Sequence, residues 1–212
     1  MNKDNIRICT ITHHTVLNYG AVLQAYALQK AIKKLGYNSE VLDYDSERVK
    51  RVYITSLKQV KTLKHFIKYV FFPYDKERKR NIQKFVDDNI IVSKKRYKKE
   101  ELIDSNKIYD LFITGSDQVW NDRCARFDRN FFLDFPCARL KKRASYAASF
   151  GMKQIPAEKR NEYKRRLSDF AAYSVRENEG KEILSDLLGV NASVNCDPTL
   201  LLDYSEWNDI TT

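Results

Sequence analysis

The sequence has no long hydrophobic run. No stretch of its 212 residues approaches the roughly 20 consecutive apolar residues that a membrane-spanning helix needs. The first seven residues are polar or charged apart from Met1 and Ile6, and a signal peptide requires an apolar segment there. The hydrophobic content of 43% nevertheless suffices for a core, so we expect one large folded domain in the cytoplasm.

Metal and nucleotide motifs are missing as well. The four cysteines, at positions 9, 124, 137 and 196, form no CxxC pair and have no nearby His pair with metal-ligand spacing. The sequence therefore predicts no structural zinc, disulfide framework or other metal site. Cys9 and Cys196 lie inside apolar runs, where we expect them in the core. Neither a GxGxxG nor a Walker sequence occurs, so a nucleotide fingerprint is not supported.

The net charge of +10 comes from one part of the chain. Residues 48–99 contain 17 lysines and arginines and 4 aspartates and glutamates, a net charge of +13, which leaves the remainder slightly acidic. Apolar residues recur there at helical spacing on either side of Pro73: Leu57, Val60, Leu63, Ile67 and Val70, then Ile82, Phe85 and Val86. We interpret residues 48–105 as a basic helical insertion, whose charged faces are either simply solvated or bind anionic lipid, phosphorylated carriers or nucleic acid.

Elsewhere, short β-branched runs alternate with helical patterns, which is typical of a parallel sheet with crossover helices. The expected strands are residues 6–12, 38–43, 109–114, 143–149, 173–176 and 193–196. The expected helices are residues 21–35, 157–170 and 177–188, the first and last of which end before a glycine. Residues 1–198 are thus predicted to form a Rossmann-like α/β domain with about six parallel strands.

Ligands of open α/β sheets bind beyond the carboxyl ends of the strands, so the loops there carry the candidate site. The first loop contains His13 and His14, which face opposite ways in an extended chain, so that only one readily faces a ligand. Asn18 either caps the following helix or binds a ligand beside its N-terminus. Gly20 would let a ligand approach the backbone.

The loop after the third predicted strand gathers polar groups and an indole: Gly115, Ser116, Asp117, Gln118, Val119, Trp120 and Asn121. Sugar sites use amides and carboxylates for hydroxyl groups and an aromatic face for the ring. Such a cluster at a strand end has little packing purpose, so it predicts a carbohydrate site.

Two further loops are chemically unusual. Residues 145–151 are mostly small, including Ser149, which permits close approach of either a ligand or another segment. Arg176 ends a strand where a helix begins, and its guanidinium group suits phosphate or carboxylate. A structural pairing of Arg176 with Glu177 or Asp197 is the alternative.

Five ordered blocks of these residues resemble the polysaccharide pyruvyl transferase family. They are residues 18–28, 115–121, 146–151, 174–177 and 197–200. The resemblance implies the N-terminal, acceptor-side half of a two-domain enzyme like the GT-B glycosyltransferases, with residues 199–212 beginning the linker to a second domain. The family's later His and Arg motif has no match before Thr212, so the resemblance implies only half of the active site.

The implied activity is transfer of the enolpyruvyl group of phosphoenolpyruvate to two hydroxyls of one sugar, forming a pyruvate ketal in cell-envelope or exopolysaccharide biosynthesis. The implied catalytic residues are Asp117 and Arg176. The implied substrate-binding residues are His14, Asn18, Tyr19, Gly20, Gly115, Ser116, Gln118, Trp120, Asn121 and Ser149.

The implied partners are phosphoenolpyruvate and a sugar or lipid-linked oligosaccharide, with neither cofactor nor metal. Peripheral association with the inner face of an anionic membrane fits the basic insertion, whereas nucleic acid is not expected. Two alternatives remain open: half of a glycosyltransferase that uses a nucleotide sugar, or a non-catalytic basic module that binds a membrane surface or nucleic acid.

Overall fold

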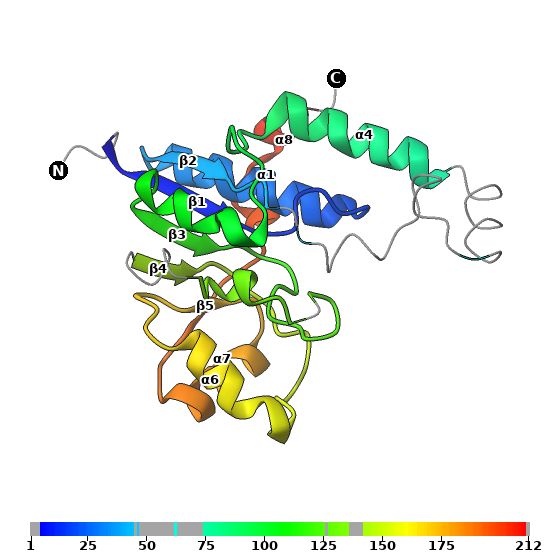
Figure 1. Cartoon of the computed structure of the whole chain (residues 1–212). Coiled ribbons are helices and arrows are strands. Elements are labelled where there is room, and N and C mark those ends of the chain that lie inside the picture. Colours follow the sequence, from blue (N-terminus) through cyan, green and yellow to red (C-terminus); the bar gives the residue numbers. More distant parts are fainter. Residues whose placement is uncertain are drawn as a thin grey trace.

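The computed structural model describes residues 5–44, 46, 62, 74–125, 127–135 and 142–210. Its strands and helices alternate along the chain (Figure 1). In order they are β1 (Arg7–Ile11), α1 (Tyr19–Lys34), β2 (Asn38–Val41), α4 (Tyr74–Asn89), the 3-10 helix η3 (Lys99–Lys107), β3 (Leu111–Thr114), η4 (Arg129–Phe132), β4 (Lys142–Ser145), η5 (Ala157–Lys159), α6 (Arg160–Leu167), β5 (Ser174–Val175), α7 (Asn178–Leu188), β6 (Ser193–Val194), η6 (Pro198–Leu201) and α8 (Tyr204–Asn208).

The central sheet has four parallel strands in the order β2-β1-β3-β4. In β1, Cys9 pairs with Glu40 of β2 on one side and with Phe112 of β3 on the other. Side chains alternate between the two faces of a strand: Ile8 packs with α1, whereas Cys9 lies in the aromatic core on the opposite face. The sequence prediction of an α/β fold with a parallel sheet and flanking helices is confirmed.

All six predicted strand positions contain a strand, but the prediction of one sheet of about six strands is wrong. β5 and β6 form a separate parallel pair, joined to the central sheet by the isolated bridges Ala144↔Ala172 and Ala148↔Val175. The interruption comes from Ala147, whose φ of 47° lies in the left-handed region and ends β4 early. The hydroxyl of Ser174 accepts the backbone N–H of Ala147 at 3.0 Å, so the side chain of β5 replaces a ladder bond.

The helices follow the predicted capping signals. α1 is capped by Asn18 and is followed by Gly36 at φ 84°, and α7 ends at Gly189 at φ 68°. The single helix expected over residues 157–170 is instead η5 followed by α6, which stops at Leu167.

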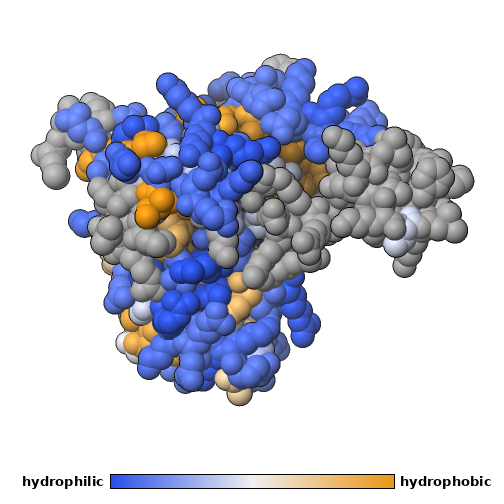
Figure 2. Space-filling model, in the orientation of Figure 1, coloured by the Kyte–Doolittle hydropathy of each residue, from blue (hydrophilic) through white to orange (hydrophobic). Residues whose placement is uncertain are grey.

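The basic insertion is only partly helical in the portion that the structure describes. The helix predicted around residues 57–70 lies outside the described residues. After Pro73, α4 buries Ile82 and Val86 against the α1 side of the fold, as the spacing predicts (Figure 1). Residues 90–98 then run beside β2 through the bridges Val41↔Val92 and Tyr44↔Tyr97. The face shown in Figure 2 is predominantly hydrophilic, with hydrophobic residues in separate small patches.

The final segment folds back onto α1. Leu202 is buried in the cluster formed by α1 and α4, and the rings of Trp207 and Tyr26 lie 5.8 Å apart. Lys34, near the end of α1, pairs with Glu206 at 2.9 Å. The residues expected to begin a linker thus form η6 and α8; their connection to a second domain stays a prediction.

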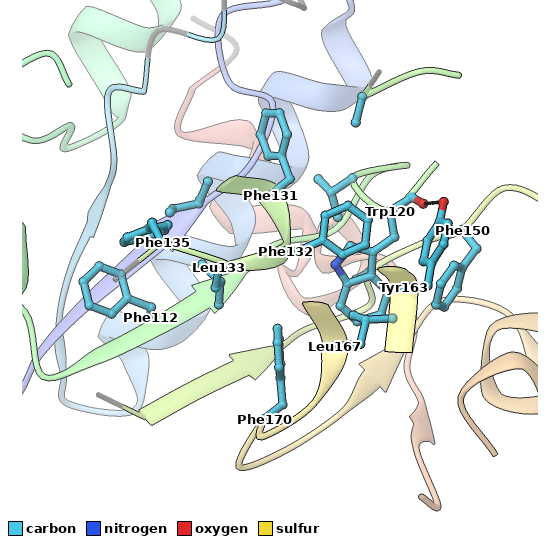
Figure 3. Packing of buried hydrophobic residues seen from close by; sticks show 14 of the residues in the cluster. Phe112, Trp120, Phe131, Phe132, Leu133, Phe135, Phe150, Tyr163, Leu167 and Phe170 are labelled. Atoms are coloured by element: carbon cyan, nitrogen blue, oxygen red, sulfur yellow. Dashed lines mark hydrogen bonds between the residues drawn. The ribbon is translucent and has the colours of Figure 1, made fainter. Parts of the chain in front are cut away.

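The largest core lies on the other side of the sheet, where aromatic rings from β3, the following loops and α6 meet (Figure 3). Cys9 is buried there, as predicted. The same prediction for Cys196 is wrong, because it follows β6, an edge strand with both residues exposed. No helix in the described part of the chain is long and apolar enough to cross a membrane.

Candidate functional site

The polar loops predicted from the sequence meet at the carboxyl edge of the sheet. The hydroxyl of Thr12, after β1, donates to the carbonyl of Ser116, after β3, at 2.7 Å. The N–H of Ser149, after β4, donates to the carbonyl of Asp117 at 3.0 Å. The N–H of Arg176, after β5, reaches the carbonyl of Ala148 at 3.3 Å. Residues from Thr12 to Arg176 therefore share one edge of the sheet.

Gln24, which the sequence analysis did not include among the site residues, holds the first loop in place. It is 2% exposed and donates from Nε2 to Thr12 Oγ1 at 2.8 Å, to the carbonyl of Ala21 at 2.6 Å and to the carbonyl of His13 at 3.4 Å. The signal available in the sequence is a glutamine within the apolar face of a helix, where a buried amide requires partners.

His14 interacts with the loop that follows β2. Its side chain is 3% exposed, Nδ1 lies 3.3 Å from the carbonyl of Thr12, and Nε2 lies 3.8 Å from a carboxylate oxygen of Asp43. His14 and Arg96 lower the pKa of Asp43, although burial alone would raise it. This placement suits an internal pairing better than the predicted contact with substrate.

The N-terminus of α1 is open. Asn18 is exposed and its Oδ1 accepts the N–H of Ala21 at 3.4 Å, so the helix cap is present. Tyr19 is 52% exposed, and the guanidinium group of Arg78 from α4 lies 5.0 Å from its ring centroid. Among the described residues, a Cβ on Gly20 would meet only Asn18 Oδ1, at 3.4 Å, so their packing does not require a glycine there.

Gly115 and Asp117, near the start of the loop after β3, are constrained in different ways. A Cβ on Gly115 would lie 2.9 Å from Cβ of Thr12, so glycine is needed for the close approach of the first two loops. Asp117 has a φ of 104°, which is strained for a residue with a side chain. Strain of this kind is concentrated at functional sites, so it supports Asp117 as a candidate site residue.

Trp120 lies in the core. Its indole is 0% exposed and packs at centroid distances of 5.0 Å from Phe150, 6.1 Å from Phe170 and 6.4 Å from Phe132 (Figure 3). Tyr163 donates its hydroxyl to the Trp120 carbonyl at 2.7 Å. The faces of the ring are thus occupied by protein, and this placement does not fit the predicted role as a sugar platform.

The amide residues of this loop bind one another. Asn121 Nδ2 donates to Gln118 Oε1 at 2.9 Å, and both side chains lie over Gly151, where an added Cβ would come within 2.7 Å of each. Cys124 Sγ also contacts Gln118 Oε1, at 3.1 Å, and burial raises the pKa of this thiol. Ser149 is 2% exposed and its Oγ accepts the N–H of Gly151 at 3.0 Å.

Asp197 joins the ends of three strands. Its Oδ2 accepts from Ser116 Oγ at 2.8 Å and from Arg176 Nη1 at 3.3 Å, while Oδ1 accepts from the N–H and hydroxyl of Thr199. Arg176 also lies 3.9 Å from Glu177 and is 33% exposed. We call Ser116, Arg176 and Asp197 the Asp197 cluster. The alternative pairing of Arg176 with Asp197 is therefore present, and the guanidinium group remains accessible.

His13 also lies at the carboxyl edge of the sheet, after β1. It is 8% exposed, and its ring centroid lies 4.5 Å from that of Phe131 in η4. Burial lowers its pKa, and the nearby charge of Asp117 partly opposes this effect. In the described residues, no group of three or more His, Cys, Asp or Glu side chains is placed to hold a metal ion.

A parallel sheet with flanking helices and polar loops gathered at its carboxyl edge defines a Rossmann-like α/β domain with a candidate binding edge. The family model for polysaccharide pyruvyl transferase matches residues 18–212, and the chain belongs to this family of transferases. Membership implies, in general terms, a pyruvyl donor and a polysaccharide acceptor. A search of curated proteins and a search of solved structures each gave no significant match.

Proposed function

We propose that this domain forms one half of a GT-B-like enzyme that transfers the enolpyruvyl group of phosphoenolpyruvate to two hydroxyls of a cell-envelope or exopolysaccharide sugar. Membership of the polysaccharide pyruvyl transferase family supports the reaction class. The observation that carries the proposal is the Asp197 cluster, which brings an accessible guanidinium group to the carboxyl edge beside a serine hydroxyl.

The reaction consists of four chemical changes. The methylene carbon of the donor takes up a proton, the first sugar hydroxyl bonds to the adjacent carbon, phosphate leaves, and the second hydroxyl bonds to the same carbon. Of the two hydroxyl protons, one is balanced by the new methyl group and the other by the departing phosphate. The site must therefore supply an acid, a base and cationic groups for the phosphate and carboxylate.

Arg176 meets the cationic requirement. Its Nη1 is held by Asp197, whereas its other donors can form the paired hydrogen bonds that guanidinium makes with a carboxylate or phosphate. Ser116 shares the same carboxylate oxygen, so the cluster fixes the guanidinium group relative to the end of β3. Asp197 thereby orients Arg176 and reduces the entropy lost when an anion binds.

The test is a phosphate-release assay of the full-length protein with phosphoenolpyruvate and a panel of lipid-linked and nucleotide-linked sugars. Ketal formation on the sugar, checked by mass spectrometry, distinguishes transfer from simple hydrolysis. Absence of turnover on the whole panel by the folded enzyme would count against the proposal. Binding of nucleoside diphosphates that phosphoenolpyruvate does not displace would instead favour a glycosyltransferase.

Replacement of Arg176 tests its part in this scheme. Arg176→Ala should weaken phosphoenolpyruvate binding about 10- to 100-fold, because a charge-assisted hydrogen bond contributes about 1.5–3 kcal/mol. Arg176→Lys is the matched control: it keeps the charge but loses the planar fork, and it should recover only part of the affinity. Equal donor affinity in all three proteins, measured by calorimetry, would make Arg176 structural.

A further inference from the structure

The proposed reaction needs a base for the acceptor hydroxyl, and the carboxyl edge offers few free candidates. His14 is hydrogen-bonded to Thr12 and lies near Asp43. Asp197 accepts four hydrogen bonds. His13 differs from both, because no hydrogen bond to its ring is found within the described part of the chain.

The surroundings of His13 fix the ring firmly. Phe131 packs against it at 4.5 Å and is itself held by an edge contact with Tyr44 at 5.9 Å. The hydroxyl of Thr114, at the end of β3, donates to the Phe131 carbonyl at 2.9 Å, and Gln24 donates to the His13 carbonyl. Figure 3 shows Phe131 standing apart from the group around Trp120.

Two carboxylates and one other titratable ring influence His13: Asp117 after β3, Asp128 before η4, and its neighbour His14. Asp128 is already engaged, since Oδ2 accepts from Tyr44 and Ser46 and Oδ1 accepts from the N–H of Asn130. Asp117 accepts only the adjacent N–H of Gln118, on Oδ1, in the described structure, and has the larger effect on His13.

We propose that His13 is the base that receives the proton of the attacking sugar hydroxyl, with Asp117 as the nearby carboxylate whose charge stabilises the protonated ring. This inference rests on the proposed pyruvyl transfer. As the hydroxyl oxygen bonds to the enolpyruvyl carbon, its proton moves to a ring nitrogen of His13. A separate acid protonates the methylene carbon and regains its proton from the second sugar hydroxyl as that oxygen bonds to the same carbon. The leaving phosphate takes the proton held by His13, which returns the base to its neutral form.

The burial of His13 and the backbone strain at Asp117 support these roles. A buried histidine is neutral near pH 7, and a neutral imidazole is the form that can accept a proton. The negative charge of Asp117 favours the imidazolium that results, as a carboxylate does beside a catalytic histidine. Asp117 has a φ of 104°, and backbone strain of this kind is concentrated at functional sites.

The kinetic test compares three variants with the active wild-type enzyme. His13→Gln should lower kcat about 10²- to 10⁴-fold, leave the KM for phosphoenolpyruvate within about twofold, and remove the acid limb of the pH profile of kcat/KM. Asp117→Asn should cause a smaller loss. His14→Gln is the matched comparison, since it changes the adjacent buried histidine and should retain the acid limb.

Failure of this inference differs from failure of the proposed function. If the wild-type enzyme turns over and His13→Gln keeps its acid limb with less than tenfold loss of kcat, His13 is not the base. If the wild-type enzyme has no activity on any acceptor, the proposed function fails instead. Circular dichroism confirms that each variant is folded.

A second measurement needs no activity and applies even if His13→Gln does not fold. NMR titration of the histidine rings should show His13 with a pKa below the ordinary value. In Asp117→Asn this pKa should fall further, because the charge that opposes the effect of burial is removed. An unchanged His13 titration in Asp117→Asn would overturn the pairing.

Discussion

The carboxyl edge of the sheet has two parts that are built differently. In the closed part, at the ends of β1 and β3, His13 and Gln24 are less than 10% exposed and the loops approach so closely that Gly115 has no room for a side chain. In the open part, Arg176 and Asp197 are 33% and 25% exposed and interact as an ion pair. The closed part is suited to proton transfer, because burial shifts pKa values. The open part is suited to binding an anion from solvent.

The largest expected effect on stability is steric and arises in the closed part. Gly115→Ala should lower the free energy of unfolding by about 1–3 kcal/mol, because the new Cβ would overlap Thr12, whose own Cβ cannot move without the backbone. Gly20→Ala is the matched control, since an added Cβ there meets only Asn18 Oδ1 within the described part of the chain, and alanine favours a helix. Urea unfolding measures both; equal losses at the two glycines would contradict the distinction.

A smaller effect should appear in the pH dependence of stability. The folded pKa of His13 is lowered, so below about pH 6.5 the unfolded state binds more protons than the folded state. The free energy of unfolding should therefore decrease as the pH falls from 7 to 5.5, and His13→Gln should reduce this slope. Urea unfolding at four pH values checks it, and an unchanged slope in the variant would place the proton uptake elsewhere.

The smallest effect on stability is expected in the open part. Because both partners are partly exposed, Asp197→Asn and Arg176→Ala should each cost about 0–1 kcal/mol, and 0.5 M salt should weaken the pair by screening. Thermal unfolding at low and high salt measures this. A loss above 3 kcal/mol for Arg176→Ala would show that the open part is as tightly built as the closed part.

Local patterns predicted the positions of the strands and helices, because burial and capping depend on neighbouring residues. The break between β4 and β5 was not predictable, since the left-handed φ of Ala147 is stabilised by Ser174, which lies 27 residues away. The same limit applies to Trp120, whose burial depends on rings contributed by α6 and the loop after β4.

The candidate site residues also differ in how far local sequence predicts their surroundings. Arg176 could be proposed as a site residue because its position at a strand end is visible in the sequence, and its observed pairing with Asp197 was one of two alternatives. His14 was predicted to face the substrate, whereas among the described residues it is the His13 ring that makes no hydrogen bond and that the charge of Asp117 influences. The alternation of an extended chain shows that the two histidines face opposite ways, but the choice between them depends on which loop packs against each.

Asp197 also stands where the chain leaves the sheet and begins its return over α1. Its side chain accepts the N–H of Thr199 at the start of η6, and the following residues Leu202 and Trp207 pack against α1. If detachment of this segment from α1 also releases Arg176, hydrogen exchange should detect the two events as a single unit. Through Asp197, the contacts of Arg176 are therefore adjacent to the point where the last segment docks on α1.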